Sequence, residues 1–392
     1  MPTAAPRLQL PQRDQPRTGE PAPDPAPATI RALTGLRALA ALWVVAFHYR
    51  FDVVTLVPGL GPLRGLMAAG YLGVDVFFAL SGFVLAYNYA DRLAQWNLGR
   101  ARSFVQNRVA RVWPVHAVTL HLDLVQAAVV GTLGVAADGH RRTLSAYLQN
   151  LTMTHGWWSD RPSFNAPAWS ISAEWAAYLA SPLLMLALAR VRRPGSAALG
   201  VLALYVAMLV AFALWALPNG NVPHAGMLRV GVEFTAGVLL LRVYQRRPRW
   251  LAHLALPLVA VIVVAVMAVP VMRHGYWLAP ALGLLVLLVA LDEGPVGWAL
   301  STRAAVFWGE ASYALYMSHL LLSRGLHALV DPRDVVSSPL PVRLLVLILY
   351  AGALAAAAVL LRRLVEVPAR RRLRHGRALA QRREPERNLA LG

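Results

Sequence analysis

The chain of 392 residues contains no cysteine, which excludes disulfides, thiolate metal ligands and a cysteine nucleophile. It also contains no lysine, so all 38 of its Lys and Arg residues are arginines. The absence of lysine excludes the lysine of a phosphate-binding P-loop and a lysine Schiff base. Any chemistry of this chain must therefore use histidine, carboxylate, arginine or hydroxyl side chains.

Negative charge is scarce as well, since 19 acidic residues leave a formal net charge of +19. Such a charge is common among nucleic-acid-binding proteins, but most arginines here lie between apolar runs or in the tails, where membrane orientation accounts for them. We expect no nucleic-acid partner. Hydrophobic residues make up 57% of the chain, and apolar stretches of about 20 residues, enough to cross about 30 Å of hydrocarbon, recur along it. The sequence predicts an all-α, multi-pass protein of the plasma membrane, in contact with the lipid bilayer.

The apolar pattern predicts a bundle of about ten transmembrane helices. They are expected near 36–54, 70–90, 109–132, 168–189, 197–217, 226–242, 251–270, 275–291, 304–328 and 342–364. Arginines are concentrated in the loops after the second, fourth and sixth spans, and cytoplasmic loops carry the excess of arginine in membrane proteins. Both termini are therefore expected in the cytoplasm.

The ends of the chain differ from its apolar centre. Residues 1–29 are rich in proline, arginine and polar residues, which predicts a disordered cytoplasmic tail, and they lack the apolar region of a signal peptide. Residues 30–366 form the expected membrane domain. Residues 367–392 form an expected basic cytoplasmic tail, which would hold the last helix against anionic lipid headgroups.

Three ionisable residues of the first, second and fourth expected spans are His48, Asp75 and Glu174. Such groups are costly in hydrocarbon, and they usually persist because a site uses them. Counting residues from the expected span ends puts all three at a similar depth in the outer half of the bundle. We expect them to face one another, with Glu174 or Asp75 orienting His48 as a general base. Pairing near the interface is an open alternative for Asp75.

Arginines mark the opposite side of the expected membrane. Arg37 precedes His48 by eleven residues, a rise of about 16 Å along a helix. Arg108 and Arg111 are spaced to share one helix face, and together with Arg37 they could bind phosphates. Anchoring to the cytoplasmic lipid surface is the alternative for this pair.

Weaker candidates support this set. Ser81, Ser170, Tyr313 and His319 are candidates for supporting roles, although small hydroxyl residues also mediate close helix packing in membranes. His116, His121 and Asp123 lack a metal-ligand spacing, so no metal site is expected.

Several motifs resemble the successive signatures of the acyltransferase type 3 family of membrane O-acyltransferases, over about residues 30 to 366. They are Thr34–Ala41 followed by His48, Gly73–Phe83, the Arg108 and Arg111 pair, Ala168–Glu174 and Ser312–His319. The resemblance implies transfer of an acyl group, commonly acetyl, from cytoplasmic acyl-CoA to a hydroxyl of a sugar, a surface glycan or a macrolide. Acyl-CoA is then a donor substrate, and no bound cofactor is expected.

In that family the arginine and histidine of the first span are essential, the paired arginines are associated with acyl-CoA, and the glutamate of the fourth span is associated with the active site. His48 would then deprotonate the acceptor hydroxyl or carry the acyl group itself. The basic tail after the last span suggests a small acceptor, and a carbohydrate is favoured slightly over a macrolide. A secondary transporter is the alternative of another class, although the inverted repeats typical of transporters are not detected.

Overall fold

The computed structural model describes residues 29–132, 142–158, 163–215, 223–268 and 275–372. The expected N-terminal tail, apart from residue 29, and the expected C-terminal tail after residue 372 lie outside the described residues. Every regular element in the described part is helical, which agrees with the predicted all-α class.

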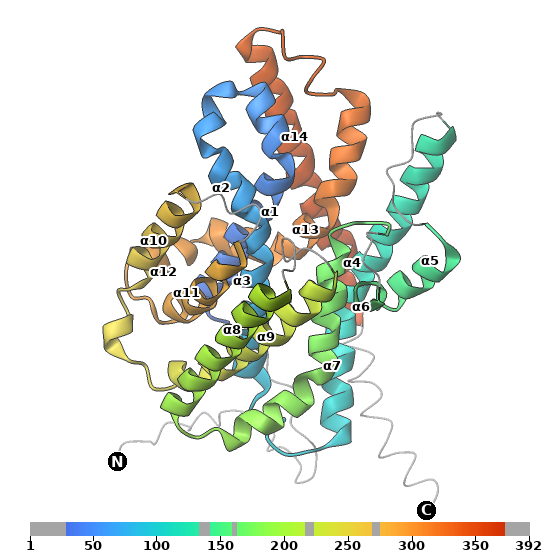
Figure 1. Ribbon diagram of the computed structural model, residues 1–392. Helices are drawn as coiled ribbons and strands as arrows, with labels where there is room; N and C mark the ends of the chain where they lie inside the picture. The colour runs from blue at the N-terminus through green and yellow to red at the C-terminus, as the bar shows by residue number, and fades with distance from the viewer. Residues whose placement is uncertain (1–28, 133–141, 159–162, 216–222, 269–274, 373–392) are drawn as a thin grey trace, which may run out of the picture.

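Each expected span coincides with a helix (Figure 1). These helices are α1 Arg31–Leu56, α3 Gly73–Tyr89, α4 Leu98–Thr132, α7 Ala168–Arg190, α8 Pro194–Trp215, α9 Pro223–Tyr244, α10 Ala255–Ala268, α11 Ala279–Leu291, α13 Arg303–Leu329 and α14 Leu340–Leu361. Short helices that were not expected occupy the connections: α2 Arg64–Ala68, α5 Leu144–Leu151, α6 His155–Trp158 and α12 Pro295–Leu300.

Five helical segments of the described chain are long and apolar enough to cross a membrane by length and composition. They are Arg31–Leu56, Pro58–Tyr89, Ala168–Arg190, Pro194–Leu214 and Leu340–Arg372. Helix α8 exposes Leu199, Leu202, Val206 and Leu214, which follow one another at helical spacing. Because a large exposed apolar stripe needs an apolar partner, this surface fits hydrocarbon rather than water.

Helices α3 and α9 lie side by side and run in the same direction through the centre of the bundle. A Cβ atom at Gly82 would lie 1.9 Å from the carbonyl oxygen of Phe234, and one at Gly237 would lie 2.0 Å from that of Ala79. Only glycine permits this backbone contact, as small residues do at membrane helix interfaces.

Helices α1 and α13 form the second central pair, and they also run in parallel. Three contacts set their register: the backbone of Thr34 meets Gly309, the ring of His48 meets that of His319, and Asp52 meets His327. Since Gly73 packs against Ala40 and Val44, α3 begins beside the middle of α1 and runs antiparallel to it.

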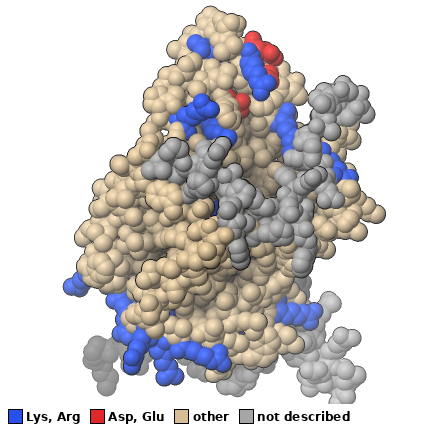
Figure 2. Space-filling view, viewed as in Figure 1, with Lys and Arg blue, Asp and Glu red and all other residues tan. Residues whose placement is uncertain are grey.

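Arginine is concentrated at the end of the bundle where α1 begins and where α7 and α9 end. Figure 2 shows blue side chains without red ones along the lower edge of the molecule, whereas blue and red side chains both occur near the top of this face. We call the lower edge the arginine-rich end and the other the opposite end. This grouping is the one expected if the arginine-rich loops share one side of a membrane.

Candidate functional site

The side chain of His48 contacts another histidine, not a carboxylate. Its Nδ1 atom lies 2.9 Å from the carbonyl oxygen of Val44 and 3.1 Å from Nε2 of His319, and the two ring centroids are 4.8 Å apart. His319 is fully buried and His48 is half-buried. The register of α1 and α13 therefore brings together two histidines that are far apart in sequence.

The hydrogen bonds of the pair determine which ring nitrogens carry protons. Nδ1 of His319 lies 2.5 Å from the carbonyl oxygen of Tyr316 and must donate to it, so in the neutral ring Nε2 is the acceptor. Nδ1 of His48 then donates to the Val44 carbonyl and to His319 Nε2. Nε2 of His48 remains a lone-pair nitrogen with no hydrogen-bond partner among the described residues. This is the state that a general base requires.

The predicted pairing of Asp75 with His48 is wrong, because Asp75 binds Arg229 of α9. Arg229 donates from Nε to Asp75 Oδ1 at 3.0 Å and from Nη2 to Oδ2 at 2.6 Å, with both side chains almost fully buried. Since Gly73 lies level with Val44, Asp75 also lies at least one turn closer to the arginine-rich end than His48. Glu233, one turn after Arg229, lies beside this ion pair, fully buried.

Glu174 does not contact His48 either. Its Oε1 atom accepts a hydrogen bond of 2.6 Å from the hydroxyl of Tyr178, which in turn lies 3.3 Å from the hydroxyl of Ser81. Tyr178 packs against Arg108, whose guanidinium carbon is 6.0 Å from the ring centroid. Glu174 therefore belongs with the arginines and not with the histidines.

Arg37, Arg108 and Arg111, which we call the inner arginine cluster, gather between α1, α4 and α7. Arg37 is within electrostatic range of Arg111, Glu174 and the buried Glu366. Nε of Arg37 and Nε of Arg108 are buried without a hydrogen-bond partner among the described residues. Buried guanidinium donors of this kind are suited to an anionic ligand.

The remaining supporting candidates, Ser170 and Tyr313, make hydrogen bonds between α13, the helix that carries His319, and its neighbours. The hydroxyl of Ser170 lies 2.8 Å from that of Tyr316, which donates to the Pro167 carbonyl at 3.0 Å. Tyr313 donates to the carbonyl of Val112 in α4 at 2.6 Å. These hydroxyls are engaged in bonds that connect α13 to α4 and α7, and they fix the helix that carries His319.

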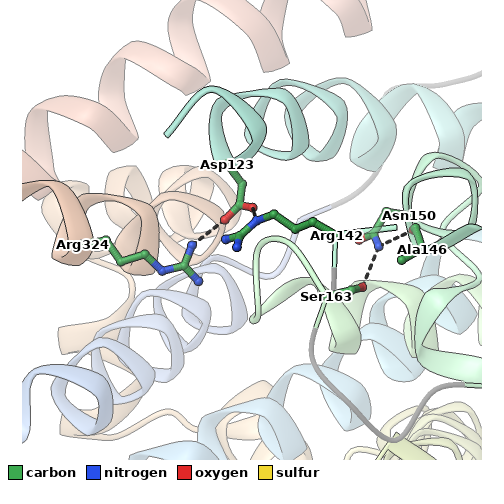
Figure 3. Close-up of polar contacts among 6 residues, drawn as sticks. All are labelled: Asp123, Arg142, Ala146, Asn150, Ser163 and Arg324. Atoms are coloured by element: carbon green, nitrogen blue, oxygen red, sulfur yellow. Dashed lines mark hydrogen bonds and ion pairs between the residues drawn. The ribbon is translucent and has the colours of Figure 1, made fainter. Parts of the chain in front are cut away.

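Two groups of polar contacts lie near α5 (Figure 3). Asp123 of α4 accepts hydrogen bonds from Arg142, at 3.1 Å, and from Arg324 of α13. Asn150 of α5 donates to the hydroxyl of Ser163 at 2.8 Å. The first group attaches the start of the α5 segment to α4 and α13, and the second attaches α5 to the segment that follows it. In the described part of the chain no group of three or more His, Cys, Asp or Glu residues could hold a metal.

Sequence reasoning missed Arg229 and Glu233. A charged pair at i and i+4 within the apolar span 226–242 is the signal that could have revealed them. The hydrogen bond between His48 and His319 had no comparable signal, because it depends on how α1 and α13 pack.

Comparison with known proteins gives a consistent result. Residues 30–362 match the family model described as an acyltransferase domain. The chain is 28% identical over 329 residues to the acyltransferase MdmB of Streptomyces mycarofaciens, an alignment that covers 78% of this chain and 82% of that protein. No solved structure matches the chain.

Two further relatives match over shorter regions. Protein 2 in the picA locus of Rhizobium radiobacter is 36% identical over 112 residues, covering 28% of this chain and 53% of that protein. A protein of Staphylococcus aureus (strain COL) whose name proposes O-acetyltransferase activity is 25% identical over 169 residues, covering 41% of this chain and 25% of that protein. The family match decides for an enzyme over the transporter alternative, and the chain belongs to the acyltransferase 3 family of membrane O-acyltransferases.

Proposed function

We propose that the enzyme transfers an acetyl group from cytoplasmic acetyl-CoA to a hydroxyl group of a carbohydrate, with His48 as the general base. The observation that carries this proposal is the unbonded Nε2 atom of His48, whose tautomer is fixed by the Val44 carbonyl and by His319. Nε2 takes the proton of the acceptor hydroxyl as its oxygen attacks the thioester carbon. The C–S bond then breaks, and the CoA thiolate recovers the proton from the imidazolium.

His319 acts as a positioning residue in this mechanism. Its neutral Nε2 accepts from His48 Nδ1–H, which keeps the His48 ring in one orientation and stabilises the imidazolium that forms during the reaction. A second histidine does this without placing a negative charge beside the base. That avoids the cost of an ionised carboxylate at this depth in the membrane.

The donor enters from the arginine-rich end, which we propose faces the cytoplasm of a plasma-membrane protein with both termini inside. The inner arginine cluster binds the phosphates of acetyl-CoA. The rise of about 16 Å from Arg37 to His48 is comparable to the pantetheine arm, so the thioester reaches the histidine pair. Glu174 balances the charge of these arginines, and Asp75 holds α3 against α9.

A carbohydrate hydroxyl is our proposed acceptor, and a macrolide hydroxyl is the alternative that the same experiment tests. Release of free CoA from acetyl-CoA would be measured with purified wild-type protein while sugars and macrolides are added one at a time. Release that depends on a sugar supports the proposal, and release that depends only on a macrolide replaces the acceptor class.

Absence of release with every donor and acceptor from folded protein would overturn the proposed reaction. Acid quenching followed by mass measurement of the intact protein separates the two roles of His48. An increase by one acetyl group in wild type, and none in His48→Ala, would replace general-base catalysis with an acyl-histidine intermediate.

A further inference from the structure

The arginine-rich end carries a depression of about 360 Å³ that the proposed mechanism does not use. It is lined by Arg192, Arg242, Gln245 and Arg246, which come from the turn between α7 and α8 and from the end of α9. The lower edge in Figure 2, where blue side chains gather, is the end to which these residues belong. No acidic side chain is among the lining residues.

Arg242, one of the lining residues, is held by two hydrogen bonds. Its Nη1 donates to Oε1 of Gln245 at 3.0 Å and its Nη2 donates to the carbonyl oxygen of Leu188 at 3.1 Å. Its Nε is buried and has no hydrogen-bond partner in the described part of the chain. Arg192 and Arg246 are exposed, so one fixed guanidinium and two adjustable ones line the same depression.

Orientation in the membrane explains why arginines occur at this end, but it does not require several of them to line one depression. Like charges repel one another, and here no lining carboxylate offsets the repulsion. Arginine is the side chain best shaped for planar, bidentate binding of phosphate. An anion bound in the depression would offset the repulsion among these arginines.

We propose that this depression is a binding site for the phosphate group of an organic phosphate. The phosphate has two possible sources, a phosphomonoester of the donor nucleotide or the phosphodiester of an anionic lipid headgroup. Leu188 follows Tyr178 by ten residues, so the depression lies about 15 Å beyond the inner arginine cluster along α7. It is thus a second phosphate site, and only its nucleotide source rests on the proposed function.

The test compares two double variants that each remove two positive charges from the same end of the molecule. Arg192→Gln with Arg242→Gln changes the depression, whereas the control, Arg193→Gln with Arg249→Gln, changes exposed arginines outside its lining. Binding of adenosine 3′,5′-bisphosphate is measured by calorimetry with the full-length protein in detergent. Retention of phosphatidylglycerol over phosphatidylcholine is measured by native mass spectrometry.

We expect the depression variant to lose about tenfold in one of these two measurements, because charge-assisted hydrogen bonds are lost, and the control to change by less than twofold. Loss of nucleotide binding identifies the donor as the source, and loss of lipid retention identifies the membrane. Equal losses in both variants, or no loss in the depression variant, would overturn the proposal. Neither measurement needs turnover, so failure of the proposed function would appear separately, as an absence of CoA release from wild type.

Discussion

Two of the polar pairs that join helices inside this bundle differ in which atoms they leave without a hydrogen bond. Asp75 and Arg229 connect α3 to α9, are both almost fully buried, and use both carboxylate oxygens in hydrogen bonds. His48 and His319 connect α1 to α13, but His48 is half-buried and its Nε2 has no partner in the described chain. A polar group whose hydrogen-bonding atoms are all paired stabilises the packing of helices, whereas a group with an unpaired nitrogen or oxygen can take part in catalysis.

The largest effect is expected from His48→Ala. Removing a general base typically lowers the rate by about 10²–10⁴-fold, and we expect such a loss in kcat for acetyl transfer while the protein keeps its size-exclusion profile. His121→Ala is the matched control, since that histidine binds Tyr147 instead, with His121 Nε2 and the tyrosine hydroxyl 3.0 Å apart. If folded His48→Ala transfers acetyl groups at the wild-type rate, His48 is not the base, and the proposed difference in function between the two pairs is refuted.

Arg229→Met should act on stability rather than on chemistry. Breaking a buried ion pair from one side costs about 3–5 kcal/mol, because the remaining charge is buried without a partner. Thermal unfolding in detergent should show this loss, and Asp75→Leu added to Arg229→Met should recover most of it. A double variant that is stable yet inactive would assign Asp75 to catalysis, which contradicts a purely structural role for the Asp75–Arg229 pair.

Tyr178→Phe tests the assignment of Glu174 to the donor end. It removes one hydrogen bond to a carboxylate, a contribution of about 1.5–3 kcal/mol, so we expect the KM for acetyl-CoA to rise about tenfold with little change in kcat. Tyr147→Phe, at the opposite end of the bundle, should leave this KM unchanged. A fall in kcat at constant KM would instead place Glu174 with the reacting atoms.

The smallest effect separates positioning from catalysis at His319. His319→Leu removes one of the two acceptors of His48 Nδ1–H and leaves the Val44 carbonyl in place. At about 1 kcal/mol for one hydrogen bond, this should lower kcat by about fivefold. His319→Gln supplies an amide oxygen in its place and should recover most of the rate. If both variants are as inactive as His48→Ala, His319 acts on the substrate itself.

The sequence predicted where the helices lie but not how they pack. Apolar runs located the ten helices expected as spans, although α10 and α11, with 14 and 13 residues, are shorter than a full membrane crossing. His48, Asp75 and Glu174 were expected at one depth because their spans were taken to start level with one another. In the structure α3 begins beside the middle of α1, which moves Asp75 toward the arginine-rich end. Glycine contacts such as that at Gly73 set these offsets, and they depend on which helices meet.

The hydrogen bond between the histidines also has a consequence for the order of synthesis. His48 leaves the ribosome well before its partner, which follows 271 residues later in the chain. Until α13 has been inserted beside α1, the Nδ1–H group of His48 has only the Val44 carbonyl of its own helix as an acceptor. A nascent or prematurely terminated chain therefore carries the base without its contact to a second helix, and the His48–His319 pair forms only when nearly all of the bundle is in place.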